Sequence, residues 1–328
     1  MKKNLLLVSL AILILVPAHF AEAQQSAKRI SKIGYLSPLS PLTESSRREG
    51  FIQGLHELGY VEGQNVSLEY RYAQGNRNQF FELAAEMVGL NPDVIVVGSN
   101  SFTAAAKEAT RAIPIVAAGG DLVGERLVAS LRRPGENITG SSSIAPEFSG
   151  TRLKLLKEAV PNISRVAILW FPRPNSTDEK EVRETEITGR ELGVDIKVVP
   201  VRDPDAFTAV FTAMKKENVN ALVIIQGTFT LFHRKQLVEL AARNRLPSMC
   251  ETSDWTADSC LISYGPDPSY RYYRLAFMVD KILKGAKPGE LPVEKPTKFD
   301  LVINLNTAKQ IGLTIPPNVL ARVDKVIR

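Results

Sequence analysis

Small polar side chains follow short apolar segments at several points of this 328-residue chain. The clearest case is Gly98-Ser99-Asn100-Ser101, which follows the apolar residues 94–97 and precedes a segment of helical composition. In an open parallel sheet, ligands bind beyond the carboxyl ends of the strands, where loops meet the first turns of helices. Hydroxyl groups, amide groups and the free N–H groups of a first helical turn suit a carboxylate or another acceptor-rich group. The pattern therefore predicts a small-molecule site at the strand ends.

Twelve residues at such positions are candidate ligand contacts, and they fall into three chemical groups. Ser37 and residues 99–101 would hold a carboxylate or similar group, while the Ser141 region would add hydroxyl groups from the side of a hinge. Asp254 or Asp121 would hold an ammonium group, and large aromatic side chains would cover an apolar part of the ligand. The full set is Ser37, Ser99, Asn100, Ser101, Asp121, Ser141, Ser142, Phe171, Gln226, Phe229, Asp254 and Trp255.

Each of these residue types also has a plainer structural role. Ser and Asn cap helices without any ligand, and Asp121 fits a helix cap as well as a ligand contact. Trp255 and Phe229 fit the core of a lobe, which is the commoner place for large aromatic side chains. Asp254 fits a loop position.

The sequence lacks the short motifs of common catalytic, nucleotide and metal sites. There is no Gly-x-Ser-x-Gly, no phosphate-binding Gly-x4-Gly-Lys-Ser/Thr and no His/Cys metal spacing. The glycines of residues 117–125 do not fit the Gly-x-Gly-x-x-Gly dinucleotide pattern. We therefore predict no catalytic residue, no metal ligand and no cofactor, with a secreted α/β enzyme as a less favoured alternative.

Two cysteines, Cys250 and Cys260, lie at the end of one predicted strand and at the start of the next. In an oxidising compartment an even pair fits a disulfide bond. Two buried thiols that pack as small apolar side chains are the other interpretation.

Residues 1–23 have the composition of a secretory signal peptide. Lys2 and Lys3 precede an apolar run, and Ala21-Glu22-Ala23 fits an A-x-A cleavage site. Because the run is shorter than a membrane span requires, an N-terminal anchor is the less favoured interpretation. We expect cleavage after Ala23 and an exported, periplasmic chain.

Composition and charge indicate a globular protein that does not bind nucleic acid. Hydrophobic residues make up 44% of the chain and charged residues 23%, so intrinsic disorder is not expected. The formal net charge is +6, but Lys and Arg are scattered among Glu residues and form no basic stripe interleaved with aromatics.

Apolar runs alternate with helical patterns along most of the chain, which predicts parallel sheets with helices on both faces. The pattern restarts near residue 150, so we expect two α/β lobes of similar size. The predicted strands are 32–38, 65–73, 93–99, 113–118, 165–170, 195–201, 221–227, 246–250, 260–267 and 301–305. The predicted helices are 44–60, 78–90, 103–112, 124–134, 150–164, 179–193, 204–218, 232–245 and 270–284, with a short one that ends at Gly312.

Several segments resemble one family of exported proteins. They include "GLHELGYVEGQNVSLEYR", "NPDVIVVG", "LVASLRRPGENITG" and "VDKILKGAKPGELPVEKPTKFDLVINLNTAKQIGLTIPP", and the similar regions extend over residues 33–317. The chain resembles the ABC-transporter substrate-binding family often described as tryptophan/tyrosine-type.

The resemblance implies the type I periplasmic-binding-protein fold: α/β, with two Rossmann-like lobes whose parallel sheets are joined by a three-segment hinge. The lobes would comprise residues 28–139 plus 264–295 and residues 140–263 plus 296–328. A solute in the cleft between them would be delivered by a monomeric receptor to an ABC permease in the inner membrane. Partnership with a membrane sensor is the alternative.

The resemblance is weakest at the expected cleft. Where the family often has Gly-Gly-Thr-Pro, this chain has Gly98-Ser99-Asn100-Ser101. Phe171-Pro172 replaces an Asn-Pro, Gly227-Thr228 replaces an Asp-Pro, and Leu122 replaces the proline after Asp121. We expect an amino acid or related carboxylate as ligand, and the altered strand ends argue against assuming an aromatic one.

Overall fold

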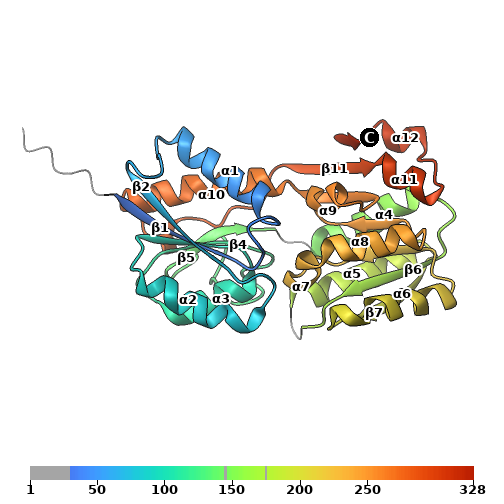
Figure 1. Cartoon of the computed structure of the whole chain (residues 1–328), viewed down its shortest axis with the longest axis horizontal. Coiled ribbons are helices and arrows are strands. Elements are labelled where there is room, and N and C mark those ends of the chain that lie inside the picture. The colour runs from blue at the N-terminus through green and yellow to red at the C-terminus, as the bar shows by residue number, and fades with distance from the viewer. Residues whose placement is uncertain (1–29, 144–145, 174–175) are drawn as a thin grey trace, which may run out of the picture.

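The computed structural model describes residues 30–143, 146–173 and 176–328. Its strands form one sheet of five strands and one of seven. Figure 1 shows the two resulting lobes side by side along the longest axis of the molecule. The predicted α/β fold with two parallel-sheet lobes is confirmed, whereas the predicted signal peptide lies outside the described residues.

The first sheet has the strand order β2-β1-β3-β4-β5 and is parallel throughout. Helices α1 and α10 pack on one face of it and α2 and α3 on the other (Figure 1). Both faces are therefore covered, as the continuous apolar strands require. The elements are β1 (Ser31–Ser37), α1 (Ser45–Glu57), β2 (Val66–Tyr72), α2 (Phe80–Gly89), β3 (Val94–Val97), α3 (Asn100–Ala109), β4 (Ile115–Gly119), β5 (Ile138–Ser142) and α10 (Pro268–Leu283).

The second sheet has the order β12-β11-β10-β9-β8-β6-β7, in which β10 and β11 alone pair antiparallel. Its strands are β6 (Arg165–Trp170), β7 (Asp195–Pro200), β8 (Ala221–Ile224), β9 (Ser248–Cys250), β10 (Ile262–Pro266), β11 (Phe299–Asn304) and β12 (Lys325–Ile327). Its helices are α4 (Pro146–Ala159), α5 (Thr177–Glu191), α6 (Phe207–Lys216), α7 (Thr228–Phe232), α8 (Arg234–Arg243), α9 (Ser253–Ala257), α11 (Leu305–Ile311) and α12 (Pro317–Leu320).

The chain passes between the two sheets three times: from β5 to α4, from β10 to α10, and from Glu294, which pairs with Ser141, to β11. Strand pairing assigns residues 140–142 to the first sheet and residues 264–266 to the second. We therefore propose lobe boundaries that follow Ser142 and Pro266, a few residues beyond those expected from the sequence.

The helix predicted over residues 124–134 is not formed. This segment is a series of turns, in which Leu127 N donates back to Leu122 O and Arg126 adopts φ +58. A non-glycine residue in the left-handed region interrupts helical hydrogen bonding. The connection from β4 to β5 is therefore a loop.

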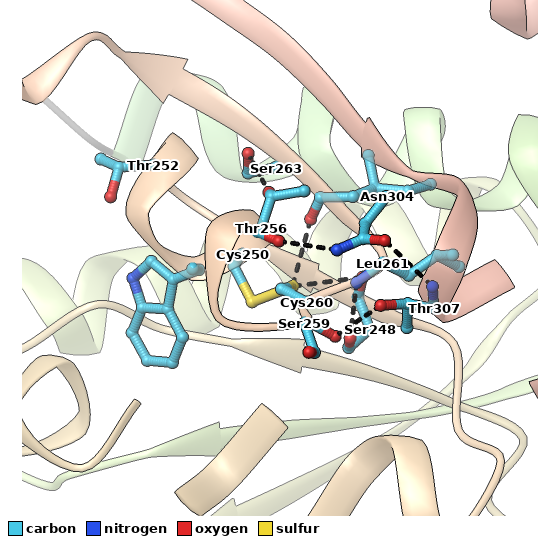
Figure 2. The surroundings of a disulfide bond; sticks show 12 residues. Ser248, Cys250, Thr252, Thr256, Ser259, Cys260, Leu261, Ser263, Asn304 and Thr307 are labelled. Carbon is cyan, nitrogen blue, oxygen red and sulfur yellow. Dashed lines mark hydrogen bonds between the residues drawn. A yellow bond between two sulfur atoms is a disulfide. The ribbon is translucent and has the colours of Figure 1, made fainter. Parts of the chain in front are cut away.

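Cys250, at the end of β9, forms a disulfide bond with Cys260, which lies two residues before the start of β10 (Figure 2). The segment between them carries α9, which is held from outside by Asn304 Nδ2 donating to Thr256 O at 3.0 Å and by Thr307 Oγ1 donating to Ser259 O at 3.2 Å. The disulfide bond thus closes the segment covalently, and hydrogen bonds fasten it to the end of β11 and to α11.

The contact between α1 and α10 provides a test of the fold. A Cβ atom on Gly50 would come within 2.1 Å of the Ser269 carbonyl oxygen, so Gly50→Ala forces the two helices apart. Overpacking of this kind costs about 1–3 kcal/mol, which chemical denaturation measures. The control is Gly89→Ala in α2, where a Cβ atom meets nothing within 4 Å; equal stability of the two variants would contradict the packing.

The disulfide bond gives a second prediction. A cross-link between residues 10 apart restricts the unfolded chain, and its loss should lower the free energy of unfolding by about 3 kcal/mol. The two cysteines are the only ones in the sequence, so a reductant acts on this bond alone. Denaturation midpoints with and without reductant measure the effect, and the Cys250→Ala/Cys260→Ala variant should be insensitive to reductant.

Candidate functional site

A cavity of about 120 Å³ lies between the lobes, at the carboxyl ends of β1, β3 and β4 on one side and of β6, β8 and β9 on the other. The second crossing segment contributes Pro266 and Pro268 to its wall. Its position agrees with the expectation that polar loops after the strands meet at one site.

Four of the twelve predicted contacts line this cavity: Ser99, Asn100, Ser101 and Gln226. Ser99 caps α3 by accepting a hydrogen bond from Phe102 N at 3.2 Å. Asn100 Oδ1 accepts from Gly120 N at 2.9 Å, which joins the ends of β3 and β4. Ser99 therefore both caps a helix and lines the cavity.

The other predicted serines lie behind the cavity wall. Ser37 Oγ donates to Glu44 Oε2 at 2.8 Å, and Ser142 Oγ donates to Gly120 O at 2.6 Å. Ser141 Oγ accepts from Arg271 Nε at 3.0 Å. Their hydroxyl groups orient neighbouring groups and do not face the cavity.

The three predicted aromatic contacts do not line the cavity either. Trp255 is fully buried in the core of the second lobe, where its Nε1 donates to Gln226 Oε1 at 2.7 Å. Phe171 and Phe229 pack on each other with ring centroids 4.9 Å apart. Trp255 thus follows the plainer interpretation and fixes the side chain of Gln226.

The two predicted aspartates pair with basic side chains of the opposite lobe. Asp254 Oδ2 lies 2.6 Å from Arg47 Nη1, and Asp121 Oδ2 lies 2.9 Å from Lys180 Nζ. Asp121 Oδ1 also accepts from Gly124 N at 2.7 Å. Both carboxylates therefore bridge the lobes at the rim of the cleft.

Sequence reasoning missed the charged groups that dominate the cavity wall. Five carboxyl groups and three guanidinium groups line it: Glu44, Glu125, Asp178, Glu181, Glu251, Arg47, Arg173 and Arg271, with Tyr272 beside them. A signal for three of them was present, because Arg47, Asp178 and Arg271 each precede a buried residue four positions later in their helix. A charge on the apolar face of a first helical turn points into the protein.

Burial shifts the titration of several of these groups. Loss of solvent raises the pKa of Glu44 and of Asp178, although Arg47 and Arg173 respectively oppose the shift. Burial, opposed by Arg152 and reinforced by Glu251, raises the pKa of Glu181 to about 8. Glu181 Oε2 nevertheless accepts from Arg152 Nη1 at 2.8 Å. Perturbed groups of this kind concentrate at functional sites.

Two further observations concern only the described parts of the chain. Within them, His, Cys, Asp and Glu residues form no group of three or more placed to hold a metal ion. In the same parts, no helix combines the length and apolar composition needed to cross a membrane.

The site can be compared with known proteins. A family model described as "ABC transporter substrate binding protein" matches residues 32–327. A tyrosine-binding protein from Clostridioides difficile (strain R20291) is 21% identical over 289 residues, which cover 88% of this chain and 82% of the relative.

Solved structures share the whole architecture. A conserved domain protein from Vibrio cholerae is 28% identical with a TM-score of 0.82, over 91% of this chain and 100% of the other. The ABC domain in complex with L-Trp from Streptococcus pneumonia is 24% identical with a TM-score of 0.83, over 90% and 99%. A ligand-free, open structure of a Clostridium difficile substrate-binding protein is 21% identical with a TM-score of 0.66, over 91% and 99%. This chain therefore belongs to the ABC transporter substrate-binding proteins, a family that binds solutes outside the cytoplasm and is not a family of enzymes.

Proposed function

We propose that this protein is a monomeric periplasmic receptor that encloses one zwitterionic solute of amino-acid type and delivers it to an ABC permease in the inner membrane. The observation that carries the proposal is the cavity between the lobes, which is lined by both carboxyl and guanidinium groups. A zwitterion compensates charges of both signs in a site that excludes water.

One weakly paired carboxyl group in the wall supports a ligand with an ammonium group. Arg47, Arg173 and Arg152 lie beside most of the wall's carboxyl groups, and Arg152 pairs directly with Glu181. Glu251 is buried, and among the described residues its one ion contact is with Arg152 Nη2 at 3.7 Å. Glu251 is therefore our first candidate for the ammonium partner.

Two relatives favour an aromatic side chain on the ligand, because one is named for tyrosine binding and the other holds L-Trp. Tyr272, Leu39 and Leu231 supply aromatic and apolar surface to the cavity. We therefore place aromatic amino acids first among the candidates, in spite of the altered strand ends.

The described conformation supports capture by closure. The lobes meet on both sides of the cavity: Ser46 Oγ donates to Asp254 Oδ1 at 3.1 Å on one side, and Thr177 Oγ1 donates to Glu125 Oε1 at 3.0 Å on the other. Contacts made only in the closed state are what a ligand needs in order to shift the equilibrium towards it.

The ligand is tested by thermal shift and calorimetry with L-tyrosine and L-tryptophan. At one hundred times its dissociation constant, a ligand adds about 2.7 kcal/mol of stability. Deaminated analogues of the two amino acids should bind at least tenfold more weakly, because they leave Glu251 without an ammonium partner. If no proteinogenic amino acid stabilises the protein, the proposed function is wrong.

The contacts between the lobes are tested by Asp254→Asn. Loss of the ion pair with Arg47 removes a contact made only when the lobes meet, so we expect a larger radius of gyration of the ligand-free protein in X-ray scattering. Ligand binding should weaken by about tenfold, or about 1.4 kcal/mol.

The matched control is Asp195→Asn, which breaks the Arg165–Asp195 pair within one lobe. This pair is half-exposed, so its loss should change neither the scattering curve nor the affinity. Superposable scattering curves of Asp254→Asn and the wild type would contradict the closing role of Asp254.

A further inference from the structure

Arg271 occupies a distinct position in the cavity wall, next to the second crossing segment. Helix α10 begins there with Asp267, which caps it by accepting from Tyr270 N at 3.2 Å, and with Pro268 in its first turn. Arg271 lies on the helix face that buries Leu275, and its side chain lines the cavity.

The guanidinium group of Arg271 is held by neutral groups of the first lobe. Nε donates to Ser141 Oγ at 3.0 Å, and Nη2 donates to the carbonyl oxygens of Ser141 and Gly119 at the ends of β5 and β4. These contacts fix the plane of the group. Nη1 donates to no described residue, so one nitrogen remains free for another acceptor.

Arg271 differs in its charge environment from the other two guanidinium groups that line the cavity. Arg47 pairs with Asp254, and Arg173 pairs with Glu125 and Asp178. No carboxylate of the described residues forms an ion pair with Arg271.

A partly buried cation that forms no ion pair is costly for the empty protein. Burial lowers the pKa of Arg271 to about 10, which still leaves the group charged at neutral pH. Buried charges are normally paired. An incoming anion would supply the missing partner and would gain more from the contact than in water.

We propose that Arg271 binds the carboxylate of the solute at the hinge side of the cavity and so makes the receptor selective for ligands with a free acid group. The inference rests on the proposed function and identifies the residue that binds the carboxylate end of the zwitterion. It places the carboxylate at α10, whereas the sequence alone suggested the first turn of α3. Glu251 of the second lobe is close enough to act electrostatically on Arg271, so a ligand that touches both residues bridges the lobes.

The test uses pairs of ligands that differ only in the acid group: L-tyrosine with L-tyrosinamide, and L-tryptophan with L-tryptophanamide. Calorimetry gives the ratio of the two dissociation constants in each pair. We expect the wild type to favour the acid at least tenfold. In Arg271→Gln this ratio should fall to about one, because the variant cannot compensate the charge of the carboxylate.

Two variants separate binding from a structural role. Arg271→Lys keeps a positive charge and should keep part of the preference for the acid. Arg274→Gln removes a guanidinium group three residues along the same helix that pairs with Glu294 and does not line the cavity, so its ratio should equal that of the wild type. If Arg271 only supported the hinge, Arg271→Gln would weaken both members of a pair equally.

The outcomes are distinct. Acid and amide bound equally by the wild type, or a preference that survives in Arg271→Gln, overturns the role of Arg271 and leaves the proposed function standing. Failure of every amino acid to bind overturns the proposed function, and the inference falls with it.

Discussion

Charged groups that leave water need partners inside the protein, and this requirement dominates the space between the two sheets. Arg47, Asp254 and Glu125 each form an ion pair with a residue of the opposite lobe, whereas Arg173 also pairs with Asp178 of its own lobe. Arg47 meets Asp254, and Arg173 meets Glu125, only when the lobes come together. In an open cleft water solvates these groups, so neither state carries a prohibitive cost. The same side chains therefore permit both opening and closing. A bound zwitterion would supply opposite charges to the cavity groups that have no close ion-pair partner among the described residues.

Most of the fold could be predicted from the sequence because its signals are local. The run Val94–Val97 is buried along its whole length, as a central parallel strand must be, and Ser99 caps the next helix as its residue type suggests. The prediction of a helix over residues 124–134 was wrong because the chain turns at Arg126, which has a positive φ. Composition alone does not reveal this backbone geometry. The lobe boundaries that we propose from strand pairing lie a few residues beyond those expected, since a strand such as β10 pairs with partners distant in sequence.

The site was harder to predict than the fold. The cavity lies at the strand ends, where the sequence pattern placed a site, but most of the predicted contact residues do not line it and instead hold neighbouring groups in place. Trp255 donates its side-chain hydrogen bond to Gln226, and Ser142 donates to Gly120 O. The charged wall was overlooked because Arg and Glu on helices are commonly solvent-exposed. Arg271 could have been noticed from its place four residues before Leu275, but only the three-dimensional structure shows that no carboxylate of the described residues forms an ion pair with it.

The late position of α10 in the chain has a consequence for biosynthesis. This helix covers one face of the first sheet, yet it is translated after β6 to β10 of the other lobe. A nascent chain that has emerged only as far as β10 leaves Tyr35 and Phe51 without the side chains of α10 that bury them. The amino-terminal lobe therefore cannot complete its core until most of the polypeptide has been made.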